Sequence, residues 1–134
     1  MAESGLSEEV VQLVREHILS LEQLEILLLL RARPGEEMSA KAAGEEVRTG
    51  ESSAASRLGD LAQRGFLSAR VVDDQTLYRY DPKDDALRHA VDLLERAYAE
   101  RRYTVINLIF AKPIDNLRVY AGAFRFRKKG DPNG

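Results

Sequence analysis

The sequence contains no cysteine, and its two histidines, His17 and His89, stand far apart in the chain. Disulfide bonds and thiolate metal sites are therefore excluded, and the lack of cysteine fits a reducing cytoplasm. Each histidine falls in a charged helical segment without a clustered carboxylate motif, which is not the pattern of a metal site. We therefore predict no metal ligands and no cofactor.

Long apolar runs are also absent. The longest covers residues 26–30, between two charged residues, whereas a helix that crosses a bilayer needs about 20 apolar residues. The N-terminus is acidic and lacks the basic and apolar regions of a secretory signal. We expect no membrane partner and a cytoplasmic location.

The formal net charge of the 134 residues is −2, which argues against strong non-specific binding of nucleic acid. Between residues 20 and 81 there are eight Lys or Arg and eleven Asp or Glu. The one dense basic segment is a tail near the end of the chain, with Arg125, Arg127, Lys128 and Lys129. This tail could bind phosphate, an acidic partner or an anionic surface, or be a solvated terminus.

Periodic apolar positions predict four helices in the first half of the chain, over residues 7–18, 20–33, 39–48 and 51–63. Ser20 and Gln23 have the spacing of a capping box at the start of the second helix. Ser39 is the expected N-cap of the third. Gly65 is expected to end the fourth in a left-handed conformation.

A β-hairpin is predicted to follow. Residues 69–72 and 76–80 are rich in β-branched and aromatic side chains, and residues 73–75 between them are polar.

From residue 83 the apolar spacing is close to 3.5, which predicts one helix of about 28 residues over 83–112. Such a helix would extend near 40 Å, further than one small domain could cover. We therefore expect a homodimer, with the N-terminal helix (residues 1–19) as an arm of the interface and residues 113–134 forming a short helix and the basic tail. The side chains expected in the dimer interface are Leu87, Val91, Leu94, Tyr98, Val105 and Leu108.

The segment from Ser52 to Leu67, SSAASRLGDLAQRGFL, resembles the recognition helix of MarR-type and ArsR-type bacterial transcriptional regulators. It has small polar residues first, then Leu-x-x-Leu, then a Gly-Phe-Leu step into a strand. The resemblance implies a winged helix-turn-helix domain over residues 20–82. The fold class is then mostly α with a small β-hairpin wing and a long C-terminal dimerisation helix.

In that family the outward face of this helix enters the major groove of DNA. The resemblance implies a homodimeric DNA-binding transcriptional regulator with double-stranded DNA as its partner. The residues that it places against DNA are Ser52, Ser53, Ala55, Ser56 and Arg57 on the helix and Arg70 and Arg79 on the wing.

Four carboxylates on the expected DNA face oppose this interpretation: Glu51, Asp60, Asp73 and Asp74. The alternative is a winged helix that binds another protein, with weak or no DNA binding. A weaker third reading is a ligand sensor, with the aromatic residues of the C-terminal helices around an effector. The sequence has no nucleophile elbow or phosphate-binding loop, so we do not expect an enzyme.

Overall fold

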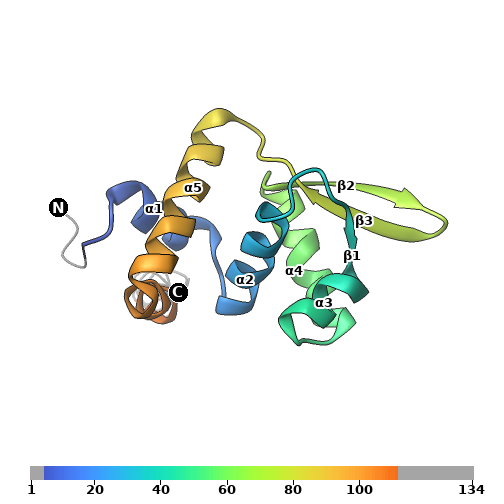
Figure 1. The fold of residues 1–134 in the computed structure, drawn as a ribbon, viewed down its shortest axis with the longest axis horizontal. Helices are drawn as coiled ribbons and strands as arrows, with labels where there is room; N and C mark the ends of the chain where they lie inside the picture. Colours follow the sequence, from blue (N-terminus) through green and yellow to red (C-terminus); the bar gives the residue numbers. More distant parts are fainter. Residues whose placement is uncertain (1–4, 112–134) are drawn as a thin grey trace, which may run out of the picture.

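The computed structural model describes residues 5–111. Its elements are α1 (Glu8–His17), α2 (Leu21–Arg31), β1 (Met38–Ser39), α3 (Ala40–Val47), α4 (Glu51–Gln63), β2 (Leu67–Val72), β3 (Gln75–Tyr80) and α5 (Asp85–Glu100), followed by a helical stretch over residues 102–111. Figure 1 shows α2 in the middle of the molecule, with α1 and α5 on one side and α3, α4 and the hairpin on the other. Within residues 5–111, no helix is long and apolar enough to cross a membrane.

The predicted helix ends are confirmed. The hydroxyl of Ser20 accepts a hydrogen bond from the backbone N–H of Gln23 (3.1 Å), and Ser39 caps α3 in the same way. Gly65 follows α4 with φ +93°, a conformation that favours glycine. In one detail the capping box differs from the prediction, because the side chain of Gln23 accepts from the N–H of Leu19.

The sheet has three strands in the order β1-β3-β2, and both pairings are antiparallel. Residues 38 and 39 form β1, whereas the sequence predicted only a helix start there. A two-residue strand is too short to show an alternating pattern, so its partner β3 defines it. The hairpin turn consists of Asp73 and Asp74, both with positive φ (52° and 66°), as two-residue hairpins require.

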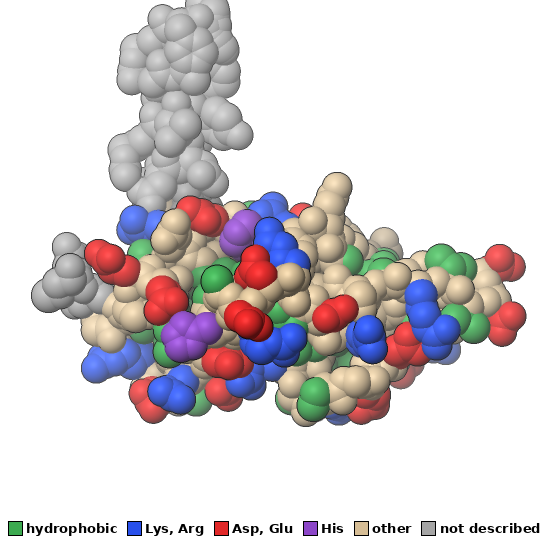
Figure 2. Space-filling view, turned by 90° about the horizontal axis from the view of Figure 1, so that it is seen from above, with side chains coloured by type: hydrophobic (Ala, Val, Ile, Leu, Met, Phe, Trp, Pro, Cys, Tyr) green, Lys and Arg blue, Asp and Glu red, His purple; other side chains and the backbone are tan. Residues whose placement is uncertain are grey.

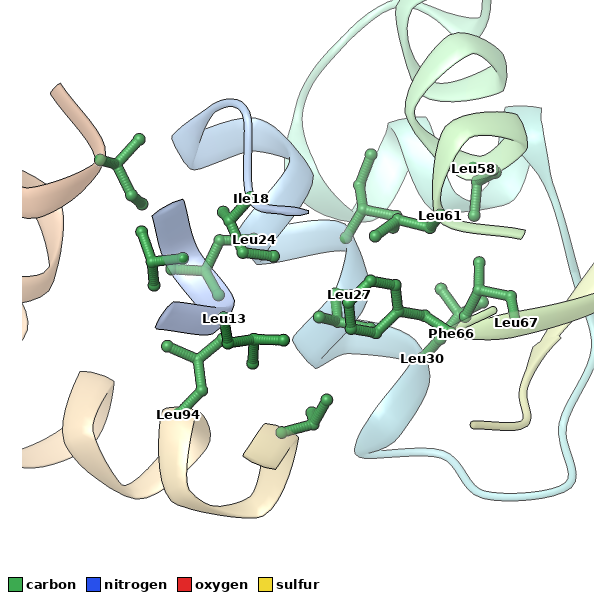
Figure 3. Close-up of a cluster of buried hydrophobic side chains, with 14 of the residues drawn as sticks. Leu13, Ile18, Leu24, Leu27, Leu30, Leu58, Leu61, Phe66, Leu67 and Leu94 are labelled. Atoms are coloured by element: carbon green, nitrogen blue, oxygen red, sulfur yellow. The ribbon is translucent and has the colours of Figure 1, made fainter. Parts of the chain in front are cut away.

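The core joins the two halves of the molecule. Figure 3 shows Leu24, Leu27 and Leu30 of α2 between two groups of buried leucines, Leu58 and Leu61 on one side and Leu13 and Leu94 on the other. The buried Phe66 lies beside Leu30, at the step from α4 into β2. Because α2 packs on both sides, its buried residues do not form one narrow stripe.

The single helix predicted over residues 83–112 is wrong. The chain leaves the helical conformation at Arg101 (φ −136°, ψ 56°), and a second helix begins at residue 102. The break falls where the apolar spacing has its gap, between Tyr98 and Val105, at the exposed Arg101 and Arg102. After the bend, Val105 and Ile109 return to the core and are buried.

The apolar positions of α5 and of the helical stretch after it face this chain's own core. Val91, Leu94 and Val105 are fully buried, and Leu87, Tyr98 and Leu108 are partly buried against the same cluster. Helix α1 packs against α5 and buries apolar surface that we expected a second copy of the chain to bury. Val91, Leu94 and Val105 therefore have no surface left for a second copy, whereas Leu87, Tyr98 and Leu108 keep part of theirs.

Candidate nucleic-acid interface

Helix α4 has a buried face and an exposed face. Ala54, Leu58 and Leu61 have no exposed surface, in agreement with the apolar periodicity that predicted this helix. Helix α3 packs against α4. A Cβ added at Gly44 of α3 would lie 2.9 Å from the carbonyl oxygen of Thr49, in the turn between the two helices, and 3.4 Å from the Cβ of Ala54 in α4.

The exposed face of α4 carries small or polar residues. Ser52, Ala55 and Ser56, all predicted to face DNA, are exposed. Helical spacing puts Ser52, Ser56, Gly59 and Gln63 along one line of the surface. Gly59 has nothing within 4 Å of a Cβ placed on it. The backbone of α4 is therefore open to close approach along this line.

Ser53 and Arg57 lie differently, because Glu22 of α2 binds both of them. The Glu22 carboxylate accepts a hydrogen bond from the Ser53 hydroxyl at 2.5 Å and from Arg57 Nε at 2.9 Å. Hydrogen bonds from Ser53, Thr49 and Arg57 lower the pKa of Glu22 to about 2. Two of the five residues predicted on this helix are thus engaged within the protein.

The two wing arginines are also engaged. Arg70 donates from Nε and from one terminal nitrogen to the two oxygens of Glu37, at 2.5 and 2.8 Å. This pair raises the pKa of Arg70 and lowers that of Glu37. Arg79 donates to the Ser68 hydroxyl at 3.0 Å and lies 3.8 Å from Asp81. Arg70 and Arg79 line one groove of about 510 Å³ beside the hairpin.

The carboxylates expected on the DNA face fall into two groups. Glu51 is exposed at the start of α4, and Asp73 and Asp74 are exposed at the hairpin tip. The prediction that Asp60 lies on the outer face is wrong. Its carboxylate accepts hydrogen bonds from the buried Gln23 (2.6 Å) and from Arg64 (2.8 Å), and is therefore turned towards α2.

Charges of both signs are interspersed on the surface. Figure 2 shows basic and acidic side chains side by side over the face drawn, and acidic side chains at the end of the hairpin. No three His, Asp or Glu residues within 5–111 are grouped closely enough to hold a metal ion. The basic tail with Arg125, Arg127, Lys128 and Lys129 lies outside the described residues.

Neither the models of protein families nor the sequences of curated proteins match this chain. Solved structures do match it. Sco5413, a MarR family transcriptional regulator from Streptomyces coelicolor, superposes with a TM-score of 0.55 at 24% identity, over 87% of this chain and 84% of that one. This chain has the winged-helix fold.

Two other winged-helix structures are similar to it. MepR, which regulates the Staphylococcus aureus efflux pump MepA, superposes with a TM-score of 0.53 at 10% identity, over 84% of this chain and 82% of that one. The homodimeric DNA-binding domain of Mb0332 from Mycobacterium bovis, a possible ArsR-family regulator, gives 0.52 at 21% identity, over 69% and 81%. At these identities the likeness establishes the winged helix itself.

Three residues of this surface were not predicted from the sequence: Glu22, Thr49 and Gln63. Gln63 was detectable, because it follows Ser52 and Ser56 at helical spacing. Glu22 was not, because it lies 31 residues from Ser53 and only the packing of α2 on α4 brings the two together. Thr49, between the third and fourth predicted helices, contributes to the same polar cluster.

Proposed function

We propose that this protein is a homodimeric, cytoplasmic transcriptional regulator of bacterial type that binds double-stranded DNA through α4. The observation that carries the proposal is the exposed face of α4, where Ser52, Ser56 and Gly59 leave the backbone accessible. A helix enters the major groove only where its outward side chains allow close approach, and hydroxyl groups can bond to base edges there. The proposal includes no enzymatic step.

The exposed face of the helix over residues 102–111 supports the homodimer. Tyr103 is 79% exposed and Phe110 is 63% exposed, and with the partly exposed Ile106 they share one side at helical spacing. Val105 and Ile109, on the other side, are buried. Large exposed aromatic side chains on one helix face are typical of an interface, and a twofold pairing of the same helix is the simplest way to cover them.

For the binding test, duplexes of random sequence are first enriched for binding over successive rounds. The affinity for the enriched, labelled duplexes is then measured by fluorescence anisotropy. We expect affinity that falls steeply with salt concentration, because bound phosphates release counterions. Ser56→Glu places a carboxylate on the exposed face of α4 and should weaken binding at least roughly tenfold. Ala86→Glu is the matched control, because it adds the same charge at an exposed position of α5.

The second candidate function is a winged helix that binds another protein. The acidic hairpin tip of Asp73 and Asp74 favours it, because this is the part of a wing that would approach a DNA backbone. This candidate replaces the first if no duplex is enriched even at low salt while a specific protein copurifies with the dimer.

A further inference from the structure

Two arginines that the sequence predicts to bind DNA phosphates are each held by a carboxylate of the same chain. Arg57 of α4 is bound to Glu22 of α2, and Arg70 of β2 is bound to Glu37, which lies just before β1. Both carboxylates come from segments more than 30 residues away in the sequence. Neither pair is a local helix or hairpin contact, so the tertiary fold places them.

The geometry of the Arg70 pair is that of phosphate recognition. Nε and a terminal nitrogen donate to two different oxygens of Glu37, which is the fork arrangement that arginine also uses with phosphate. The side chain of Arg70 is 65% exposed. A phosphate in the groove beside the hairpin can therefore approach the guanidinium, but it can take the bidentate position at Nε and this terminal nitrogen only by replacing Glu37.

The groups around Glu22 also bind an anion, which is the Glu22 carboxylate itself. Thr49, Ser53 and Arg57 surround one carboxylate at the start of α4, and these hydrogen bonds favour its charged form. Gly50, the N-cap of α4, provides no side-chain cap. Glu22 keeps 25% of its side-chain surface exposed, and Arg57 keeps 34%, so solvent and a ligand can approach the pair.

We propose that Glu22 and Glu37 act as intramolecular substitutes for DNA phosphates, and that they weaken non-specific binding by occupying Arg57 and Arg70. This inference rests on the proposed DNA-binding function. A phosphate that binds either arginine must displace the carboxylate or lie beside its negative charge, which offsets the gain from counterion release. Base contacts from the exposed face of α4 then contribute a larger share of the affinity, so the two carboxylates raise sequence discrimination.

The test compares Glu22→Gln, Glu37→Gln and Asp92→Asn with the wild-type protein. Asp92→Asn is the matched control, because it also removes one negative charge paired with an arginine: Asp92 lies 2.9 Å from Arg31, which keeps a second carboxylate, Glu95, at 4.0 Å. Asp92 lies on α5, with α2 between α5 and α4 (Figure 1). Circular dichroism checks that each variant is folded, and Glu37→Gln decides the outcome if Glu22→Gln does not fold.

Binding to a labelled duplex of mixed sequence is measured across a range of NaCl concentrations. We expect Glu22→Gln and Glu37→Gln to bind roughly two- to fivefold tighter than Asp92→Asn, the range expected for one exposed ion pair. The slope of log affinity against log salt should steepen by about one for each arginine released. Arg57→Ala added to Glu22→Gln should abolish the gain. Affinities and slopes equal to those of Asp92→Asn would overturn the proposal.

Elution from heparin-agarose separates this proposal from the DNA-binding function. Heparin is a polyanion that detects released arginines whether or not the protein binds DNA. If the two glutamate variants elute at higher salt than Asp92→Asn while no form binds duplex, the substitution of phosphate by carboxylate stands and the DNA-binding function is lost. If the wild type binds duplex and neither assay distinguishes the variants from Asp92→Asn, the DNA-binding function stands and the substitution of phosphate by carboxylate is lost.

Discussion

The Nε of Arg57 lies 2.9 Å from the Oε1 of Glu22, and this contact ties the start of α2 to the middle of α4. The same carboxylate binds Ser53. One acidic side chain therefore both stabilises the packing of two helices and removes two polar groups from the exposed face of α4.

The first prediction concerns acid stability. Because the folded-state pKa of Glu22 is about 2, below the ordinary 4.5, its contribution to stability is present above pH 4.5 and is lost as the pH falls towards 2. Glu22→Gln should therefore lower the free energy of unfolding at neutral pH, and its difference from wild type should shrink across this window. Urea unfolding at a series of pH values measures the effect. A difference that stays constant down to pH 2 would contradict the assigned role.

The second prediction concerns the close approach of α3 to the turn before α4. Gly44→Ala places a Cβ 2.9 Å from the carbonyl oxygen of Thr49, a backbone atom that cannot move without shifting the turn. We expect a loss of about 1–3 kcal/mol in the free energy of unfolding, as for other overpacked sites. Thermal and urea unfolding measure it. Unchanged stability would mean that the turn at Thr49 adjusts freely.

The third prediction has the opposite sign. Gly59 lies inside α4 with nothing within 4 Å of an added Cβ, so Gly59→Ala should stabilise the protein by about 1 kcal/mol. Gly44→Ala is its control, because the chemical change is the same and only the surroundings differ. If Gly59→Ala destabilised the protein, a contact of this glycine in the folded state would have to be found.

The fourth prediction concerns the homodimer. Replacing both Tyr103 and Phe110 by Glu should convert a dimer to a monomer, because each exposed aromatic side chain buried on association contributes roughly 1.5–3 kcal/mol. We expect the dimer dissociation constant to rise by at least roughly a hundredfold. Size-exclusion chromatography with light scattering measures the mass.

Val71→Glu is the matched control for this variant, because Val71 is 68% exposed but lies on the hairpin. It should leave the mass unchanged. If the Tyr103→Glu, Phe110→Glu variant has the same mass as the wild type, this helix face is not part of the dimer interface.

Local sequence signals determined most of the elements. Ser20 and Ser39 cap helices where predicted, Gly65 ends α4, and the apolar positions Leu58 and Leu61 define the buried face of that helix. Caps and turns depend on neighbours within about four residues, so the sequence carries this information directly. The winged helix was predicted from the resemblance of residues 52–67 to a recognition helix, and the order of these elements agrees with it.

Only the tertiary structure decided which partners the charged side chains have. It also decided that the chain bends at Arg101. The sequence shows Arg57 and Arg70 as basic residues on a helix and a strand, and nothing local indicates that Glu22 and Glu37 neutralise them. Near-3.5 spacing predicts one long helix equally well whether a second copy or α1 covers it. Contacts between residues far apart in the chain depend on how the helices pack, and this packing determines which of the exposed side chains remain available to bind a ligand.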